Sequence, residues 1–522
     1  MTSTIGFATH GDVLNGLYLA FGVLPRKQAR AEQFKEKDKK TLQKQLGRLA
    51  SEEGNFIEYY PKVVDTLRQL LEQYLPVPGE VDAVDTVLDD LESAYAALIR
   101  TEGTYLSVPD SLRYFISTQA VPILVLALKR CRLLCGGGGP GIWRDDPFWD
   151  LPSFDSGNEA RMPLARLMRW TYAACGLSQK QFHCPGKLGD PAPATQQQNL
   201  DSAVKWARGK GTPSLPALLA NFKESFAAQE AHARPVDPGL QQRVLTALVG
   251  ARLATFVAKQ IVDSYGADYL RDVCTQIRQL TELLEDEVQE FLREVAPIIL
   301  KQTCAKRAAG SWVRACAHHE GFLRDKLMQA AQALVGLLEQ GGRAPLPPER
   351  MATLERKFGK FAVHANVDRI RRQQEYVSPP GFRELLEQGF RLRRNAQAGL
   401  EDIDAFEHAI MQAGLHDTMD WFVPWLRGMY HYRREQFDAA YPWYETAFER
   451  AKYKAGEFQY DLVNQFVELA AKNGKTSAFN KGIDWALYIG IEIRWLRDKE
   501  PTRENREFVR TIMERANYAH QL

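Results

Sequence analysis

The sequence predicts an all-α, multidomain protein built of helical bundles. Apolar residues recur at steps of three and four along the chain, for example over 63–71, 81–99 and 280–292, as they do on amphipathic helices. We find no convincing run of alternating apolar and polar residues between hairpin turns, the pattern that indicates strands. A chain of 522 residues exceeds what one hydrophobic core usually serves. We therefore expect about two to four domains.

The composition is that of a globular protein, with 45% hydrophobic and 25% charged residues. The longest uncharged apolar run, 120–128, is much shorter than a bilayer crossing requires. The N-terminal region has no basic start and no small-residue cleavage site, so a signal peptide is not expected. These features predict a cytoplasmic protein without membrane contact.

The seven cysteines include no C-x-x-C pair, which argues against a disulfide framework and a zinc finger. Cys304, Cys316, His318 and His319 come nearest to a ligand cluster, but their spacing fits no common zinc pattern. H-E-x-x-H, G-x-S-x-G, P-loop and kinase signatures do not occur. We expect no metal, no cofactor and no enzymatic activity.

Glycine and proline segments divide the chain. The run G-G-G-G-P-G at 136–141 follows an apolar helical segment and precedes no G-K-[ST], so a flexible linker is favoured over a phosphate-binding loop. Two further boundaries are expected at 235–239 and 341–348. The predicted units are an N-terminal helical domain (1–135), a glycine-rich linker (136–160), a central module (161–233), a long-helix domain (240–340) and a repeat domain (348–522).

The segment 177–222 carries the most informative pattern in the chain. It opens with L-S-Q at 177–179 and closes with W-A-R-G-K-G-T-P-S at 206–214. This order resembles the Cro/repressor-type helix-turn-helix family, and the likeness covers about 164–225. It implies a first helix over 164–174, a second helix capped by Ser178, and a recognition helix from about Gln196 to Trp206.

In that family the recognition helix enters the major groove of DNA. Glutamine and asparagine can bond adenine with two hydrogen bonds, and lysine can bond guanine or phosphate. With Trp206 turned into the core, helical geometry directs Gln197, Gln198, Asp201, Ser202 and Lys205 outward. The resemblance implies a DNA-binding site made of Gln196, Gln197, Gln198, Asn199, Asp201, Ser202, Lys205, Arg208 and Lys210.

The connection between the two helices departs from the family pattern. From Gln179 to Trp206 there are 27 positions, more than the family normally has, and the extra segment contains three prolines. A loop therefore replaces the usual tight turn. The alternative is a four-helix packing domain that shares the capping residues and does not bind DNA.

The formal net charge of +2 is unevenly distributed. The segment 161–225 holds nine basic and three acidic residues, a local charge of +6, which leaves −4 for the remainder. Positive charge on a candidate DNA-binding module is what contacts to phosphates require. The segment 26–48 also carries nine basic residues against three acidic ones. That segment is either a second nucleic-acid surface or a solvated helix face.

The C-terminal part contains an internal repeat. F-D-A-A-Y-P-W-Y at 437–444 is echoed 42 residues later by F-N-K-G-I-D-W-A at 479–486, with Phe and Trp in matching places. Small and aromatic residues over 428–447 also resemble a tetratricopeptide repeat, and the likeness extends over about 379–499. It implies an array of helix pairs with a concave surface for a peptide or protein partner. In such an array Trp443 and Trp485 both pack between helices, whereas the alternative is a plain helical bundle.

Together these patterns predict a DNA-binding regulator whose C-terminal repeats sense or recruit a partner. DNA and a protein or peptide are the expected partners, and a homo-oligomer is left open. The alternative is a protein-binding scaffold or a subunit of a multi-protein bacterial complex such as a defence system. In that case the central module serves structure or non-specific nucleic-acid binding.

Overall fold

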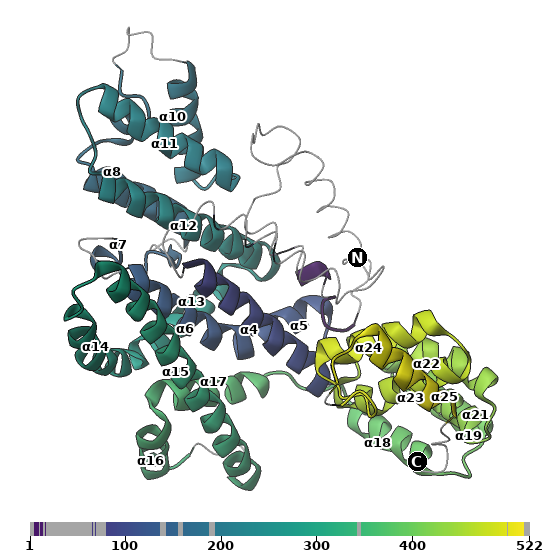
Figure 1. The fold of residues 1–522 in the computed structure, drawn as a ribbon. Helices are drawn as coiled ribbons and strands as arrows, with labels where there is room; N and C mark the ends of the chain where they lie inside the picture. The colour runs from purple at the N-terminus through teal and green to yellow at the C-terminus, as the bar shows by residue number, and fades with distance from the viewer. Residues whose placement is uncertain are drawn as a thin grey trace.

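The computed structural model describes residues 5–9, 11–13, 80–135, 142–154, 160–186, 194–341, 346–497 and 499–515, with the single residues 16, 65, 68 and 72. Among them, helices form nearly all of the regular structure (Figure 1). The named strands of this part of the chain are β1 (Ser153–Phe154) and β2 (Ala160–Arg161), which pair antiparallel. The all-α prediction is confirmed. The basic segment 26–48 lies outside the described residues.

A central body of helices occupies the middle of the molecule (Figure 1). Its main cluster joins α6, α12, α13 and α15 through Val125, Ala258, Ile277, Leu323 and other buried residues. A smaller cluster packs α16 and α17 against the end of α15. The helices of the body are α4 (Glu80–Thr101), α5 (Val108–Phe115), η1 (Ile116–Ala120), α6 (Val121–Cys135), α13 (Ala267–Leu283), α14 (Glu285–Leu300), α15 (Ala305–Gly341), α16 (Pro348–Phe358) and α17 (Lys360–Gln373). The short α7 (Ile142–Asp145) contributes Ile142 to the core of the central module.

Helices α5 and α6 are joined through a turn of π-helix, η1. Pro122 follows this turn and has no amide hydrogen for the helical ladder, which favours a local break in the α-helical pattern. The carbonyl of Ser117 accepts a hydrogen bond of 3.2 Å from Gln276, and its hydroxyl lies 2.8 Å from the hydroxyl of Tyr269. Side chains of α13 therefore satisfy the polar groups of this turn in the core.

The central module contains α8 (Pro163–Ala174), α9 (Gln179–His183), α10 (Ala194–Ala207), α11 (Leu215–Ala231) and α12 (Pro238–Tyr265). Its core includes Leu167, Phe182 and Phe222, and it continues into α12 through Val244 and Leu248. The proline-containing segment at 235–239 therefore joins α11 to α12 and does not separate two cores. Because α12 also contributes to the core of the body, the module is built onto the body through this helix.

The C-terminal helical unit, called the array below, begins at residue 382. It contains α18 (Phe382–Arg394), α19 (Leu400–Gln412), α20 (His416–Met419), α21 (Phe422–Tyr432), α22 (Phe437–Ala451), η3 (Gly456–Phe458), α23 (Gln459–Lys472), α24 (Thr476–Ile489) and α25 (Arg503–Arg515). Successive helices from α21 to α24 pack on one another. A Cβ atom on Gly428 would lie 2.6 Å from the ring of Tyr444, so the absence of a side chain permits the close contact between α21 and α22.

The two repeated tryptophans do not have equivalent environments. Trp485 is buried and donates a 2.9 Å hydrogen bond to Gln459. Trp443 is only half-buried and lines a cavity. The expectation that both pack between helices is correct for Trp485 alone. Trp485 lies on α24, which packs against α23 and α4, whereas Trp443 lies on the face of α22 that lines the cavity.

The array docks on the C-terminal end of α4 rather than standing apart. Its core includes Tyr95, Leu98 and Ile99 of α4. The guanidinium of Arg100 donates to the carbonyls of Ile489 and Gly490 at 3.2 and 3.0 Å. The predicted N-terminal domain 1–135 is therefore not an independent unit in its described part. It contributes to the cores of both the body and the array.

The N-terminal segment 5–9 reinforces this joint. The amide of Phe7 donates to the carbonyl of Tyr453 at 2.9 Å, and the amide of Gly6 donates to the carbonyl of Leu106 at the same distance. The side chain of Phe7 is buried against Tyr95. This short segment thus bridges the array and the body.

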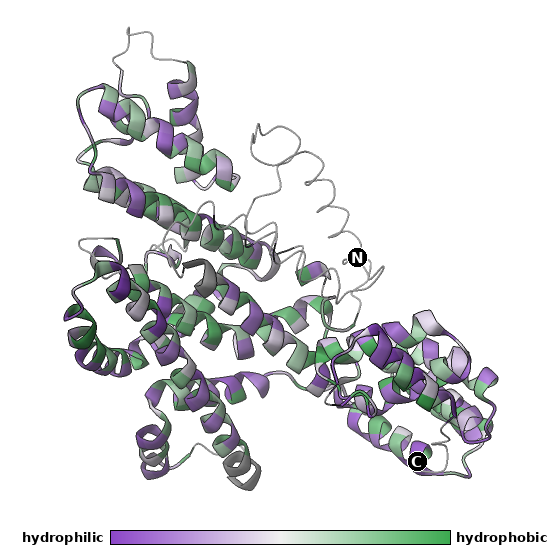
Figure 2. Ribbon diagram, viewed as in Figure 1, coloured by the Kyte–Doolittle hydropathy of each residue, from purple (hydrophilic) through white to green (hydrophobic). Residues whose placement is uncertain are grey.

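Two described helical stretches are long and apolar enough to cross a membrane, namely Val108–Leu134 and Pro238–Tyr265. The first of them contains the uncharged run 120–128. Both supply buried residues to the clusters above, as core helices of this composition do. Figure 2 shows hydrophilic residues interspersed along α12.

Candidate nucleic-acid interface

The start of α9 has the geometry that the sequence predicts. The hydroxyl of Ser178 accepts a hydrogen bond from the amide of Gln181 at 3.2 Å, and the side chain of Gln181 accepts one from the amide of Ser178 at 2.9 Å. These two bonds form a capping box, which satisfies donors that would otherwise be free at the helix start. The helix is short, however, with five residues. It is followed by a connection of which 187–193 lie outside the described residues.

The candidate recognition helix, α10, has nearly the expected bounds. It ends before Gly209, whose φ of +69° is the left-handed conformation that glycine adopts readily at helix ends. The turn that follows is fixed by α12. Lys259 donates to the carbonyl of Gly209 at 2.8 Å, and the buried Arg252 donates to the carbonyl of Pro213 at 2.9 Å. Ser214 then caps α11.

The structure places six of the nine predicted site residues at the surface and three at partly covered positions. The outward stripe of α10 is formed by Gln198, Asp201 and Lys205, at the i, i+3 and i+7 positions of one helix face. Gln196 and Ser202 are half-buried. The exposed residues of the predicted site are Gln197, Gln198, Asp201, Lys205, Arg208 and Lys210.

Three of the predicted residues are engaged within the module. Asn199 is half-buried, and its amide donates to the carboxylate of Glu224 on α11 at 3.1 Å. Gln197 donates to Asp201 at 3.0 Å. Asn199 therefore acts in the packing of α10 on α11, and the side chains best placed to reach a ligand are Gln198 and Lys205.

Trp206 differs from its expected environment. It is half-buried and packs at the edge of the module core instead of filling its centre. The centre is occupied by Phe182 from α9 and by Phe222 and Phe226 from α11, all almost fully buried. The position of Phe182 explains this arrangement, because its ring contacts both Phe222 and Phe226.

The positive charge of the module is mostly on exposed side chains. Arg166 is an exception, since it binds Asp146 and the carbonyl of Phe148. Six further cations stand on four different helices or in the turn after α10. None of these six forms an ion pair within the described part of the chain: Arg169, Lys180, Lys205, Arg208, Lys210 and Lys223. Unpaired cations retain their charge for phosphate groups.

A buried polar group that the sequence analysis missed lies beneath α9. His183 is fully buried, with Nε2 2.8 Å from the hydroxyl of Tyr172 and Nδ1 3.0 Å from the hydroxyl of Ser225. Ser225 donates its own proton to the carbonyl of Asn221, so it accepts from Nδ1–H, and Nε2 accepts from Tyr172. Burial lowers the pKa of His183 to about 3. A neutral imidazole with both nitrogens satisfied and no exposed surface serves packing.

The Cys/His cluster considered in the sequence is dispersed in the fold. Cys304 is exposed and Cys316 is buried, while the ring of His319 stacks on Phe291 at 4.3 Å. Over the part of the chain that the structure describes, no group of three or more His, Cys, Asp or Glu side chains is placed to hold a metal ion.

Comparison with known proteins gives no relative: no family model, no curated protein and no solved structure matches this chain significantly.

Proposed function

We propose that this protein binds duplex DNA through the outward face of α10 and that the C-terminal array binds a partner that regulates it. The observation that carries the proposal is the combination of an exposed helix face bearing Gln198 and Lys205 with unpaired cations at its C-terminal end. Glutamine supplies a donor and an acceptor for a base edge, and the cations supply contacts to phosphate.

The position of the module in the molecule supports access to a long ligand. Helices α10 and α11 lie at one extremity, beyond α8 and α12, and the array lies on the other side of the body (Figure 1). A duplex that contacted α10 would therefore meet the module before any other described part. The support of the turn at 209–213 by Arg252 and Lys259 also keeps the C-terminal end of α10 in place on the core.

The order of helices gives a second line of support. α8, α9, α10, α11 and α12 follow one another with the capping residues that the resemblance to the Cro/repressor-type family implies. The short α9 and the long connection before α10 remain departures from that family. An experiment must therefore test whether α10 docks on DNA at an angle that permits base contacts.

The test is selection of genomic DNA fragments by the purified full-length protein, followed by affinity measurements at two salt concentrations. Specific binding is expected to weaken steeply with salt because bound cations displace counterions from phosphates. Gln198→Ala is expected to reduce affinity for the selected sequence by about 1 to 3 kcal/mol, with little effect on non-specific DNA. Replacing Lys205, Arg208 and Lys210 with Gln is expected to lower the salt slope by about one unit per lost phosphate contact.

A charge-matched control separates this surface from general electrostatic attraction. Lys301, Lys306 and Arg307 are also exposed cations, but they lie at the junction of α14 and α15 in the body. Their replacement with Gln is expected to leave DNA binding unchanged. If the two triple variants lose affinity equally, or if no fragment is selected, α10 does not read DNA and the module is a packing domain.

A further inference from the structure

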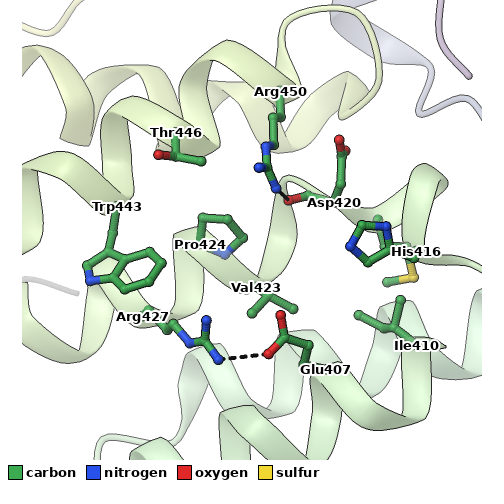
Figure 3. Close-up of a pocket in the computed structure, with 11 residues that line it drawn as sticks. Glu407, Ile410, His416, Asp420, Val423, Pro424, Arg427, Trp443, Thr446 and Arg450 are labelled. Carbon is green, nitrogen blue, oxygen red and sulfur yellow. Dashed lines mark hydrogen bonds and ion pairs between the residues drawn. The ribbon is translucent and has the colours of Figure 1, made fainter. Parts of the chain in front are cut away.

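The array contains a cavity of about 300 Å³ between α19, α21 and α22 (Figure 3). Its floor is apolar and includes Ile410, Val423 and Pro424. Trp443 forms part of the wall, and Arg450 lies at the opposite end of the lining contributed by α22. The volume is at the lower end of the range for sites that hold small molecules.

At one end of the cavity, an arginine side chain is already paired with carboxylates, whereas one carboxylate oxygen can still accept a hydrogen bond. Arg427 donates to Asp404 at 2.8 Å and to one oxygen of Glu407 at 2.7 Å, and its guanidinium carbon lies 5.2 Å from the ring centroid of Trp443. Its charge is therefore matched by two carboxylates. The second oxygen of Glu407 accepts no hydrogen bond from any residue that the structure describes. It is available to an N–H group of a ligand beside Trp443.

At the other end of the cavity, the carboxylate is already neutralised, whereas an arginine side chain still has N–H groups to donate. The carboxylate of Asp420 is bound by Lys454 at 3.1 and 3.2 Å, which neutralises it. Arg450 is exposed and donates a single hydrogen bond, of 3.2 Å, to the main-chain carbonyl of Asp420. The remaining N–H groups of Arg450 have no partner among the described residues. Arg450 is thus the cation of this cavity that retains donors for an anionic group.

These two ends are held at a fixed separation by α22. Trp443, Thr446 and Arg450 occupy the i, i+3 and i+7 positions of one face, so the ring and the guanidinium originate two turns apart, about 10 Å along the helix axis. A free amino acid carries its carboxylate next to its side chain, so it does not reach from one end of the cavity to the other. A ligand in which a spacer separates a planar ring from an anionic group can contact both ends.

We propose that this cavity binds a purine nucleoside monophosphate. The base would stack on Trp443 with an N–H edge toward Glu407, the ribose would lie over Val423 and Pro424, and the phosphate would accept hydrogen bonds from Arg450. Stacking of a base on an aromatic side chain and charge-assisted bonds from arginine to phosphate are the interactions that commonly bind nucleotides. The site lies in the array and does not depend on DNA binding by α10.

The experiment is calorimetric titration of the full-length protein, without DNA, with AMP and GMP. Adenosine, guanosine and inorganic phosphate are titrated in parallel, because the nucleosides lack the anion and phosphate lacks the ring. At least one nucleotide is expected to bind at a single site, about tenfold or more tightly than its nucleoside, and phosphate alone is not expected to compete. Absence of binding by both nucleotides would overturn the proposal.

Variants assign the binding to the cavity. Arg450→Gln is expected to reduce nucleotide affinity to that of the nucleoside, whereas Trp443→Leu is expected to weaken nucleotide and nucleoside together. The controls are Arg434→Gln and Trp495→Leu, which alter exposed side chains outside the cavity. Circular dichroism and thermal unfolding establish that each variant is folded. Equal losses in the control variants, or full nucleotide preference in the Arg450 variant, would show that the nucleotide binds elsewhere.

Discussion

A Cβ atom on Gly456 would lie 2.2 Å from the amide nitrogen of Gly103. The two glycines lie in contact where the end of α4 packs against η3, next to an antiparallel bridge between Gly103 and Ala455. The amide of Thr104 also donates to the carbonyl of Lys454 at 2.9 Å. The backbones of the body and the array are therefore in direct contact, and the contact requires the absence of a side chain at Gly456.

Gly456→Ala is expected to destabilise the array in two ways. A left-handed backbone, with φ of +55°, costs a non-glycine residue about 1 to 2 kcal/mol. The clash with Gly103 adds about 1 to 3 kcal/mol of overpacking. Gly474→Ala is the matched control, because Gly474 has φ of +64° and no atom within 4 Å of the added Cβ. Urea unfolding measures both losses, and equal values for the two variants would show that the joint tolerates a side chain.

The pKa of His183 gives a prediction for acid stability. The folded pKa of about 3 lies below the ordinary value of 6.5, so between these values the unfolded chain binds a proton that the folded chain does not. The contribution is complete above pH 6.5 and is lost as the pH falls toward 3. Between pH 7 and pH 5 the free energy of unfolding is expected to fall by about 2 kcal/mol from this residue.

His183→Gln isolates this contribution. The variant is expected to be less stable than the parent at pH 7, since the ring fills a buried position, but its loss between pH 7 and pH 5 should be smaller. His232→Gln is the control, because His232 is exposed on the same module. Denaturant unfolding at the two pH values provides the measurement. An identical acid loss in the parent and the His183 variant would show that this imidazole does not govern the acid response.

The sequence was most informative where local geometry decides the structure. The capping residues Ser178 and Ser214 and the terminating Gly209 act within a few residues of their own position, and Ser178 caps α9 as expected. The spacing of apolar residues along each helix is also a local property of the sequence, which explains why the all-α class could be predicted.

Contacts between distant segments account for what could not be predicted. Nothing near 235–239 indicates that α12 completes the core of the preceding module. Likewise, nothing in the segment 95–106 indicates that it meets Tyr453 and Gly456. The cavity at Trp443 and Arg450 also depends on α19, which lies earlier in the chain and contributes Glu407. The only sequence signal for this site was the spacing of Trp443, Thr446 and Arg450 on one helix face.

The different burial of two aromatic residues in the module predicts unequal stabilities. Phe222→Ala removes a fully buried ring that contacts Phe182 and is expected to cost about 3 to 5 kcal/mol of unfolding free energy. Trp206→Ala removes a half-buried ring at the edge of the core and is expected to cost clearly less. Guanidinium unfolding compares the two. A larger loss for Trp206→Ala would indicate that the indole, and not the phenylalanine cluster, holds α10 on the module.

An ion pair inside the body connects α6 and α15. Arg130 of α6 lies 3.2 Å from Glu320 of α15, and both side chains are at most 7% exposed. Glu320 also binds Arg324, which in turn binds Asp90 of α4. Removing one member of a buried pair leaves an uncompensated charge, which costs about 3 to 5 kcal/mol.

Glu320→Ala is therefore expected to destabilise the contact among α4, α6 and α15 by about that amount. Asp268→Asn breaks a pair with Arg271 in which the aspartate is 87% exposed, and it is expected to cost less than about 1 kcal/mol. In the double variant Arg130→Met, Glu320→Leu, both charges of the central pair are absent, so part of the loss is expected to be recovered. Thermal and urea unfolding of the three variants provide the measurement. If Glu320→Ala and the double variant lose the same free energy, the unpaired charge of Arg130 does not account for the loss.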